Sequence, residues 1–262
     1  MNTISTLKKK LSAGEKLTML TAYDHTIACL LDKAGIDIVL VGDSLGMVVR
    51  GEENTLGVTI DDMVYHTKMV KRGLNKAFLV ADMPFMSYQV NPESALINAG
   101  RLISEGGARA VKLEGGSVFR PQIEKIIKAG IPVMGHLGFT PQSVNQLGGY
   151  KIQGKSDDSA RCLMCEAKAL EEAGVFALVL EMVPAAVAAD ISKELSIPVI
   201  GCGAGPDCDG QVLVTNDILG LYSNTPKFAK QYINLRESIS NAVGQYIEEV
   251  RGGKFPCKEH CF

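Results

Sequence analysis

Asp43 and Ser44 are two chemically reactive side chains that directly follow an apolar segment, residues 36–41 with the sequence IDIVLV and then Gly42. Such a segment is typical of a strand that is buried on both faces. Glycines at 42 and 46 stand on either side of the reactive pair, and a plain turn would need neither a carboxylate nor a hydroxyl there. We therefore expect the segment to deliver Asp43 and Ser44 to a functional site, where the glycines allow close approach of backbone or ligand.

The same pattern recurs, because other apolar segments also end in residues that can do chemistry. These residues are Asp24, Asp82, Lys112 with Glu114, His136, Glu181, the glycine-rich stretch 203–205, and Asn216 with Asp217. Lys112 and Glu114 alternate on one segment, so their side chains point the same way if that segment is a strand. The pattern predicts a site at the shared edge of a parallel sheet, lined by acids, a base and an imidazole.

The aspartates at these ends allow more than one interpretation. Asp24 fits the N-cap of a helix that starts near His25. Asp43 and Asp82 fit helix caps or ion-pair partners, but two acids at equivalent points of neighbouring strands would repel each other unless a cation lay between them. The pair therefore favours a site for a hard metal ion, which prefers carboxylate oxygens.

The other polar strand ends also have two interpretations each. Lys112 and Glu114 could neutralise each other as a structural pair, and His136 could be a core histidine whose hydrogen bonds are satisfied. Glu181 follows the apolar residues 176–180, FALVL, where loss of water would favour a carboxylate that accepts protons, as a general base must.

One unit recurs through the chain and organises these ends: an amphipathic helix pattern, a glycine and a short apolar strand pattern. The helix C-termini are marked by Gly35, Gly107, Gly130 and Gly174, at positions that favour a residue tolerant of positive φ. Thr59 and Asn91 mark two helix N-termini, the second followed by a proline at the first helical position.

Eight segments read as strands in this scheme, and eight strand–helix units in about 250 residues match a (β/α)8 barrel. An open, doubly wound sheet is the alternative, although the dinucleotide fingerprint G-x-G-x-x-G is missing after the first strand. Active sites of such barrels lie at the C-terminal ends of the strands, which is where the reactive residues stand.

The composition is that of a globular protein, with 46% hydrophobic and 21% charged residues among 262 and a formal net charge of −2. This balance implies no strong attraction to nucleic acid or to an anionic membrane. Residues 1–14 lack the apolar core of a signal peptide and no apolar run reaches membrane-spanning length, so we expect a cytoplasmic protein. No linker divides the sequence, and we expect residues 1–262 to form one domain.

Two other features have weaker functional interpretations. Seven cysteines are an odd number, which excludes a complete disulfide framework, and the lone pair Cys162 and Cys165 lacks the further ligands of a zinc site. The glycine-rich segment 201–210, GCGAGPDCDG, would suit a phosphate after a seventh barrel strand, but it also suits a tight turn or a lid.

Two aspartates, a lysine and a glutamate at one barrel mouth suit one type of reaction. Mg²⁺ held by Asp43 and Asp82 would keep positions open for the two oxygens of a 2-oxo acid, and it would acidify the carbon next to the keto group. Glu181 would remove that proton, while Lys112 and Ser44 would bind the substrate carboxylate. The resulting nucleophile would attack a one-carbon or carbonyl electrophile, which the residues alone do not identify.

Seven motifs then add a resemblance to a known family. They are TAYD at 21–24, LVGDSLGMV at 40–48, ADMPFMSY at 81–88, VKLEGG at 111–116, GHLGFTPQSVNQLGGYKIQG at 135–154, LVLEMVP at 178–184 and IGCGAGPDCDGQVLV at 200–214. In this order they resemble the motifs of the ketopantoate (3-methyl-2-oxobutanoate) hydroxymethyltransferase family of pantothenate synthesis. The resemblance runs from about Thr21 to the tail FPCKEHCF.

The resemblance implies a (β/α)8 barrel, one Mg²⁺ per subunit, 3-methyl-2-oxobutanoate as acceptor and 5,10-methylenetetrahydrofolate as one-carbon donor. It implies a large homo-oligomer such as a decamer. Matched motif by motif, Asp43, Asp82 and Glu114 would be the metal set, with Glu114 acting through water. Asp43, Ser44, Asp82 and Lys112 would contact the oxo acid.

For the chemical step, the resemblance implies that Glu181 is the proton acceptor and that His136 lies near the substrate, at the new hydroxyl. Departures from the family pattern are small: Cys202 replaces an aliphatic residue and Cys261 stands where serine is common. Residues up to about Ser12 match no motif, and we expect them to form a helix that covers the bottom of the barrel.

Two other functions stay open at this point. A related lyase or mutase of the isocitrate lyase-like barrels would use the same Mg²⁺-enolate chemistry, but the loop K-[KR]-C-G-H of those enzymes does not occur here. A non-catalytic, metabolite-binding barrel would be expected to have lost part of the ring of acids, yet every matched acid and Lys112 are present.

Overall fold

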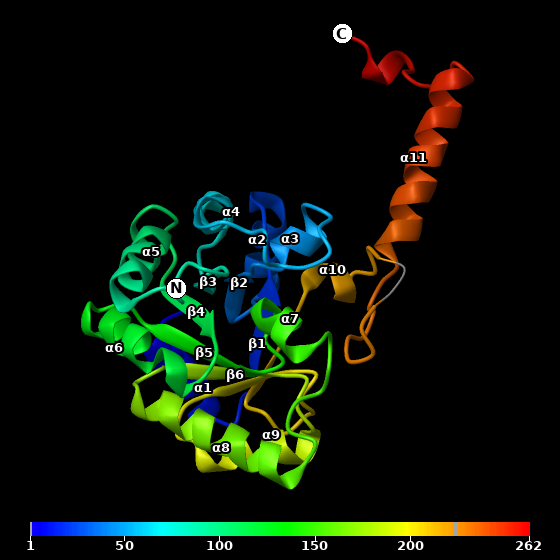
Figure 1. The fold of residues 1–262 in the computed structure, drawn as a ribbon. Helices are drawn as coiled ribbons and strands as arrows, with labels where there is room; N and C mark the ends of the chain where they lie inside the picture. Colours follow the sequence, from blue (N-terminus) through cyan, green and yellow to red (C-terminus); the bar gives the residue numbers. More distant parts are fainter. Residues whose placement is uncertain (1, 223–224) are drawn as a thin grey trace. The chain divides into compact units, whose positions relative to one another are not determined.

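The computed structural model describes residues 2–222 and 225–262 (Figure 1). The chain divides into two compact units, Met1–Leu213 and Val214–Phe262. The first unit holds all the strands named below, and the second consists of helices and their connections. That residues 1–262 form one domain stays a prediction.

The first unit is a closed barrel of parallel strands in chain order. The strands are β1 (Leu17–Thr21), β2 (Ile38–Val41), β3 (Phe78–Asp82), β4 (Ala110–Glu114), β5 (Val133–Gly138), β6 (Ala177–Glu181), β7 (Val199–Cys202) and β8 (Gly210–Leu213). Each strand pairs with the next, and β8 pairs with β1 to close the barrel. The predicted (β/α)8 barrel is therefore confirmed, and the alternative of an open sheet is wrong.

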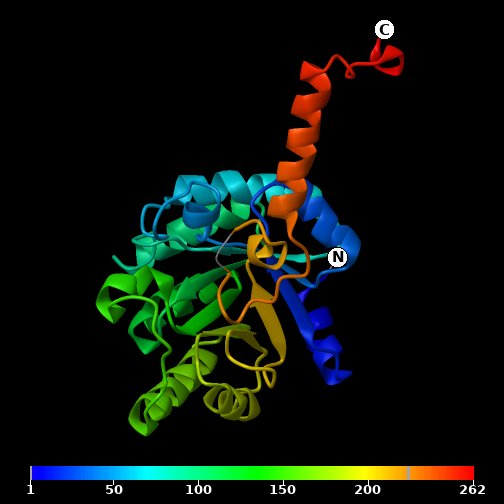
Figure 2. The ribbon, with the colours of Figure 1, turned by 90° about the vertical axis from the view of Figure 1, so that its right-hand side faces the viewer.

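Helices follow the strands and surround them, as Figures 1 and 2 show. Those of the first unit are α1 (Ile4–Ser12), α2 (His25–Ala34), α3 (Leu45–Val48), α4 (Ile60–Gly73), α5 (Pro92–Ser104), α6 (Arg120–Lys128), α7 (Val144–Leu147), α8 (Asp157–Glu172) and α9 (Ala185–Glu194). Two short 3₁₀ helices, η1 (Ser117–Phe119) and η2 (Pro141–Ser143), lie in the loops after β4 and β5.

Several helix ends are set by the residues that the sequence indicated. The Thr59 and Asn91 side chains accept the backbone N–H groups of the third helical residues of α4 and α5. Asp24 accepts the N–H of Ile27 at the start of α2, so its interpretation as a cap is confirmed. Gly35 ends α2 with φ of 89°, in the left-handed region where a glycine avoids strain.

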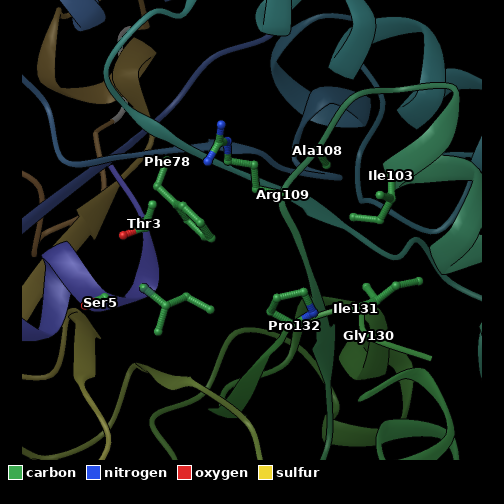
Figure 3. A pocket seen from close by; sticks show the side chains of 10 residues that line it. Thr3, Ser5, Phe78, Ile103, Ala108, Arg109, Gly130, Ile131 and Pro132 are labelled. Carbon is green, nitrogen blue, oxygen red and sulfur yellow. The ribbon is translucent and has the colours of Figure 1, made fainter. Parts of the chain in front are cut away.

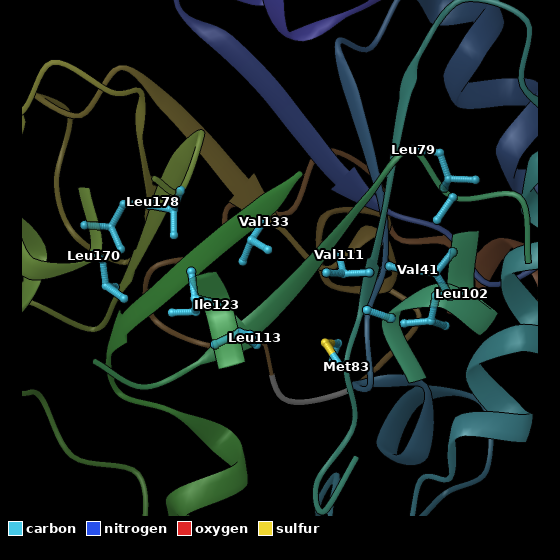
Figure 4. Close-up of a cluster of buried hydrophobic side chains, with 14 of the residues drawn as sticks. Val41, Leu79, Met83, Leu102, Val111, Leu113, Ile123, Val133, Leu170 and Leu178 are labelled. Atoms are coloured by element: carbon cyan, nitrogen blue, oxygen red, sulfur yellow. The ribbon is translucent and has the colours of Figure 1, made fainter. Parts of the chain in front are cut away.

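The barrel has two apolar layers because parallel strands are covered on both faces. The outer layer lies between strands and helices, and Figure 4 shows part of it: Val41, Leu79, Met83, Leu102, Val111, Leu113, Ile123, Val133, Leu170 and Leu178. The inner layer fills the barrel with side chains that include Met19, Leu40, Val80, Met134 and Ile200. Apolar packing on both faces holds the strands in place, and it therefore fixes the positions of the residues at their C-terminal ends.

Helix α1 covers the N-terminal end of the barrel, as predicted. Its Leu7 is 2% exposed and belongs to the inner apolar layer. A pocket of about 450 Å³ lies beside this helix, lined by Thr3, Ile4, Ser5, Phe78, Ile103, Ala108, Arg109, Gly130, Ile131 and Pro132 (Figure 3). None of the reactive residues predicted from the sequence lines this pocket.

The second unit contains α10 (Thr215–Ile218), the long helix α11 (Leu235–Arg251) and the 3₁₀ helix η3 (Lys258–His260). Asn216, one of the predicted strand-end residues, donates its amide N–H to the hydroxyl of Tyr222 within this unit. Helix α11 exposes the apolar side chains of Ile239, Val243, Tyr246, Ile247 and Val250.

Among the helices of the described ranges, 2–222 and 225–262, none is both long and apolar enough to cross a membrane.

Candidate active site

The register of neighbouring strands decides which charged side chains meet at the C-terminal end of the barrel. Asp82, the last residue of β3, pairs with Lys112 of β4. Glu114, the last residue of β4, pairs with His136 of β5. Paired residues of parallel strands lie side by side on the same face, so the register places two carboxylates next to two basic groups.

Asp82 and Lys112 form a buried ion pair, with 2.5 Å between Asp82 Oδ1 and Lys112 Nζ and about 5% of each side chain exposed. Burial would lower the pKa of Lys112, but the charges of Asp82, Glu114 and Asp43 raise it above its usual value. Lys112 is therefore a cation. The alternative of a structural Lys112–Glu114 pair is not what the structure contains, since the ammonium contacts Asp82 instead.

Asp43 lies beside Asp82, and its backbone N–H donates to Asp82 Oδ2 at 3.1 Å. Burial and the charges of Asp82 and Glu114 raise the pKa of Asp43 well above its usual range. Burial also raises the pKa of Asp82; Lys112 opposes this shift but does not reverse it. The two carboxylates thus repel each other in a dry environment, as the sequence predicted for an acid pair that lacks a cation.

Ser44 follows Asp43 at the start of α3, and its hydroxyl lies 2.8 Å from the hydroxyl of Tyr23. Gly42 is needed for this approach, because a Cβ there would stand 2.6 Å from Ser44 Oγ. Gly46 has the same role on the next turn, where a Cβ would stand 2.8 Å from Val58 Cγ2. Both glycines permit close packing of the chain around Asp43, which confirms that part of the prediction.

His136 lies between two glutamates. Its Nδ1 is 3.5 Å from Glu114 Oε1 and its Nε2 is 3.3 Å from Glu181 Oε2. Burial and Lys112 would lower the pKa of His136, but the two carboxylates outweigh them and raise it to about 9. His136 is therefore an imidazolium at neutral pH that joins Glu114 to Glu181. Both ring nitrogens thus face carboxylates of the predicted site, although neither contact has good hydrogen-bond geometry, so His136 differs from a core histidine with satisfied hydrogen bonds.

Glu181 ends β6 and keeps 19% of its side chain exposed. The surroundings of Glu181 are therefore not entirely apolar as expected, because its carboxylate contacts the His136 ring. Gly138 of β5 lets the two strands meet here, since a Cβ at Gly138 would lie 2.2 Å from the carbonyl oxygen of Glu181. The next residue, Met182, has φ of 49°, a strained conformation of the kind that occurs at functional sites.

Two further residues of the site were missed by the sequence prediction, Gln142 and Tyr88. Gln142 is 6% exposed and contacts both Asp43 and Glu114, and Tyr88 is 1% exposed and contacts Gln142. Both stand inside quoted motifs, but neither an amide nor a phenol gave a chemical reason to select it. The available signal was position, since both stand in loops that follow site strands.

Whether this site fits a divalent metal depends on its charge. Four carboxyl groups, Asp43, Asp82, Glu114 and Glu181, face two cationic groups, Lys112 and His136. Fully ionised, the site would carry two negative charges in excess, and this crowding together with burial raises the pKa of Asp43 and Asp82. Within the described residues no group of three or more His, Cys, Asp or Glu side chains is arranged to hold a metal ion. The carboxylate oxygens contact Lys112, Gln142 and His136. The donor type and the excess charge fit a hard divalent cation.

Other predicted strand-end features do not join this group. Gly203 and Gly205 have φ of 65° and 87°, and a Cβ at Gly205 would lie 2.5 Å from Ala185 Cβ of α9. These conformations suit a tight turn, and the phosphate interpretation stays a prediction. Cys162 and Cys165 are exposed free thiols on α8.

Residues 1–258 match the family described as ketopantoate hydroxymethyltransferase. A 3-methyl-2-oxobutanoate hydroxymethyltransferase of Syntrophus aciditrophicus (strain SB) is 58% identical over 257 residues, which is 98% of this chain and 93% of the relative. A protein of the same name from Enterococcus faecalis (strain ATCC 700802 / V583) is 57% identical and covers 100% of this chain and 95% of the relative. One from Clostridioides difficile (strain 630) is 55% identical with the same coverage.

Solved structures of low sequence identity share the fold. A phosphonopyruvate hydrolase in complex with oxalate and Mg²⁺ has a TM-score of 0.65 at 13% identity, over 98% of this chain and 89% of that chain. A 2,3-dimethylmalate lyase, a PEP mutase/isocitrate lyase superfamily member, has a TM-score of 0.62 at 17% identity, over 100% and 92%. At such identities the likeness shows the barrel fold alone.

Proposed function

The chain belongs to the ketopantoate hydroxymethyltransferase family, and from this premise we propose that it removes a proton from 3-methyl-2-oxobutanoate and transfers a one-carbon unit to the resulting carbanion. The donor is 5,10-methylenetetrahydrofolate, water supplies the oxygen of the new hydroxyl group, and the products are ketopantoate and tetrahydrofolate. The relatives that carry the name of this enzyme match the chain over at least 98% of its length.

One observation supports the proposal most strongly: a buried cluster with more carboxyl groups than cationic groups stands beside a glutamate that is partly open to solvent. Asp43, Asp82 and Glu114 are each about 3% exposed, while Glu181 keeps 19% of its side chain exposed. A buried excess of negative charge is costly unless it is compensated. A site that binds a cation and an anionic substrate together accounts for this charge better than a structural role does.

In this proposal Asp43 and Asp82 would hold a Mg²⁺ ion, and Glu114 would act on it through water. When bound, the ion supplies Lewis-acid polarisation of the substrate keto group. The carboxylate oxygens of Asp43, Asp82 and Glu114 fit a Mg²⁺ ion by donor type and by charge. Lys112, now bonded to Asp82, and Ser44 bind the carboxylate of the oxo acid, because an ammonium and a hydroxyl form charge-assisted hydrogen bonds with it.

Glu181 accepts the proton from the carbon next to the keto group, as a general base. His136 holds Glu181 from one side at 3.3 Å and Glu114 from the other at 3.5 Å. Through this contact it holds the Glu181 carboxylate in one orientation before the reaction. It also supplies a donor near the oxygen that becomes the new hydroxyl.

The test is direct synthesis of the product. The purified protein with Mg²⁺, 3-methyl-2-oxobutanoate and methylenetetrahydrofolate should form ketopantoate and tetrahydrofolate in equal amounts, followed by mass spectrometry and by absorbance. Formation without the folate, or none with it, would contradict the proposal. Replacing the oxo acid with phosphonopyruvate tests the related lyase and mutase chemistry, and we expect no reaction.

The proposal extends to assembly as a homo-oligomer, with a decamer expected from the family resemblance. The exposed apolar row of α11, Ile239, Val243, Tyr246, Ile247 and Val250, supports self-association because such rows are usually covered. Sedimentation of the purified protein measures the state directly, and a monomer would contradict it. A cytoplasmic location stays a prediction.

A further inference from the structure

Gln142 lies at the centre of the hydrogen bonds that hold the carboxylates of the site. It stands in η2, the 3₁₀ helix after β5, and it contacts residues that follow or end β2, β3 and β4. Its backbone N–H donates to Glu114 Oε2 at 2.9 Å, and its side-chain amide donates to Asp43 Oδ2 at 2.8 Å. One residue therefore bonds to two of the three carboxylates proposed as the metal set.

The orientation of the Gln142 amide is fixed by its other partners. Its nitrogen also donates to the carbonyl oxygen of Met83 at 2.9 Å, a group that can only accept. Its oxygen accepts from the Gln89 amide at 3.1 Å and lies 2.8 Å from the Tyr88 hydroxyl. The amide cannot turn over without placing its oxygen against the Met83 carbonyl and the Asp43 carboxylate.

Tyr88 supports this arrangement from behind. Its hydroxyl accepts the N–H of Glu114 at 3.2 Å and can donate its single proton to the Glu114 carbonyl or to the Gln142 amide oxygen. The Tyr88 ring packs edge-on against Phe119 with 5.1 Å between ring centroids. The hydroxyl is therefore held in one place by a buried ring that cannot move freely.

We propose that Gln142, held by Tyr88, is a positioning residue that fixes the Asp43 and Glu114 carboxylates at the separation and orientation needed to bind the divalent cation. Both hydrogens and the oxygen of its side-chain amide are engaged by protein groups, so it has none left for substrate. It acts through the two carboxylates. Partners of this kind typically change metal affinity 10- to 100-fold when they are removed.

This inference rests on the proposed function only in taking Asp43 and Glu114 as a metal set. Gln142→Met is the main variant, because it keeps the size of the side chain and the backbone bond to Glu114 but removes the donor to Asp43. Tyr88→Phe removes only the supporting hydroxyl. Gln122→Met is the matched control, since Gln122 is also a buried glutamine but lies on α6.

The measurement is calorimetric titration of each full-length protein with Mg²⁺ in the presence of saturating 3-methyl-2-oxobutanoate. We expect Gln142→Met to weaken Mg²⁺ binding about 10- to 100-fold, Tyr88→Phe to weaken it less, and Gln122→Met to leave it unchanged. Activity of Gln142→Met should recover as Mg²⁺ is raised, which a general loss of structure would not allow. Thermal melting of all three variants is recorded in parallel.

Wild-type Mg²⁺ affinity in Gln142→Met would overturn the inference, and so would a fall in melting temperature without a fall in affinity. If Gln142→Met does not fold, Tyr88→Phe decides: weaker binding supports the inference and unchanged binding overturns it. Absence of Mg²⁺ binding by the wild-type protein is a different result, because it would overturn the proposed metal set itself.

Discussion

The two ends of the barrel each contain a lysine–aspartate pair, and the two pairs have nearly the same length. At the end covered by α1, Lys10 Nζ lies 2.6 Å from Asp37 Oδ1; at the end with the candidate site, Lys112 Nζ lies 2.5 Å from Asp82 Oδ1. Lys10 is 37% exposed along its side chain, whereas Lys112 is 6% exposed. The pairs therefore differ in their surroundings and not in their contact.

The pKa values of the two aspartates shift in opposite directions. Burial would raise the pKa of Asp37, but Lys10 and the backbone N–H and hydroxyl of Thr18 all donate to it and lower the pKa below its usual value. Asp82 also has a lysine partner, yet its pKa is raised because it is buried with Glu114 close by. The aspartate pKa is thus lowered where Thr18 adds further donors to the lysine, and raised where a second carboxylate lies close by.

The comparison sets a pair suited to supporting the fold against a pair that is proposed to act on the metal and the substrate. Buried charges without full compensation reduce stability. The Lys112–Asp82 pair, called the upper pair below, therefore depends on the packing of the surrounding barrel, and the Lys10–Asp37 pair is called the lower pair. The lower pair joins α1 to the start of β2 and to β1 through Thr18. Substitutions at the two ends should therefore affect different properties.

The largest effect is expected from neutralising an upper aspartate. Asp82→Asn or Asp43→Asn should lower turnover about 10³-fold, because a Lewis-acid contribution of several kcal/mol is lost with the metal. Mg²⁺ binding measured by calorimetry with the oxo acid should weaken strongly, while the fold stays intact by circular dichroism. Unchanged Mg²⁺ affinity and turnover in both variants would contradict the proposal that Asp43 and Asp82 bind the metal.

The next effect isolates proton removal. With Mg²⁺ and no folate, the wild-type protein should exchange the C3 proton of 3-methyl-2-oxobutanoate for deuterium, followed by proton NMR. Glu181→Gln keeps the size of the side chain but cannot accept the proton, so exchange should fall about 10²-fold or more. Oxo-acid and Mg²⁺ binding should persist. Exchange at the wild-type rate would make His136 the next candidate for the base.

A smaller effect compares the two lysines. Lys112→Ala should raise the KM for the oxo acid about 10- to 100-fold, since a charge-assisted hydrogen bond contributes about 1.5–3 kcal/mol. Lys10→Ala is the matched change at the other end and should leave KM unchanged. If KM is constant in Lys112→Ala while its melting temperature falls, the Lys112–Asp82 pair is structural.

The smallest effect is expected on stability at the lower end. Asp37→Asn should reduce the free energy of unfolding at pH 7 by about 1–2 kcal/mol, because charge-assisted hydrogen bonds are lost, with KM unchanged. The pKa of Asp37 is lowered by folding, so its stabilisation is present above the unfolded value of 3.8 and is lost as pH falls through the folded value. Urea unfolding should therefore show the difference shrink below about pH 4. A constant difference would contradict the assignment.

Much of the fold could be predicted because its signals are local. Apolar segments, helix caps such as Asn91 and C-terminal glycines such as Gly35 depend on a few neighbouring residues. The presence of Asp43 and Asp82 at neighbouring strand ends was also readable, since a barrel brings all such ends together. Predicting these features does not require the register between neighbouring strands.

The partners of the charged residues could not be predicted, because they depend on register. Lys112 was expected to pair with Glu114 if its role was structural, but it contacts Asp82, 30 residues away in the chain. Gln142 was missed for a related reason: its importance comes from contacts with Asp43 and Glu114, and a neutral amide has no pattern in the sequence. The division after Leu213 has no composition change to mark it.

The strand register that places Asp82 beside Lys112 and Glu114 beside His136 has a consequence for how the barrel assembles. A slip of one residue between β3 and β4 would set Asp82 against an apolar neighbour of Lys112, and it would turn alternate side chains to the opposite face. Charges would then be buried without partners, at a cost of several kcal/mol. The same side chains that are proposed to act on substrate would therefore also make misaligned strand pairings less stable than the correct one when the barrel closes.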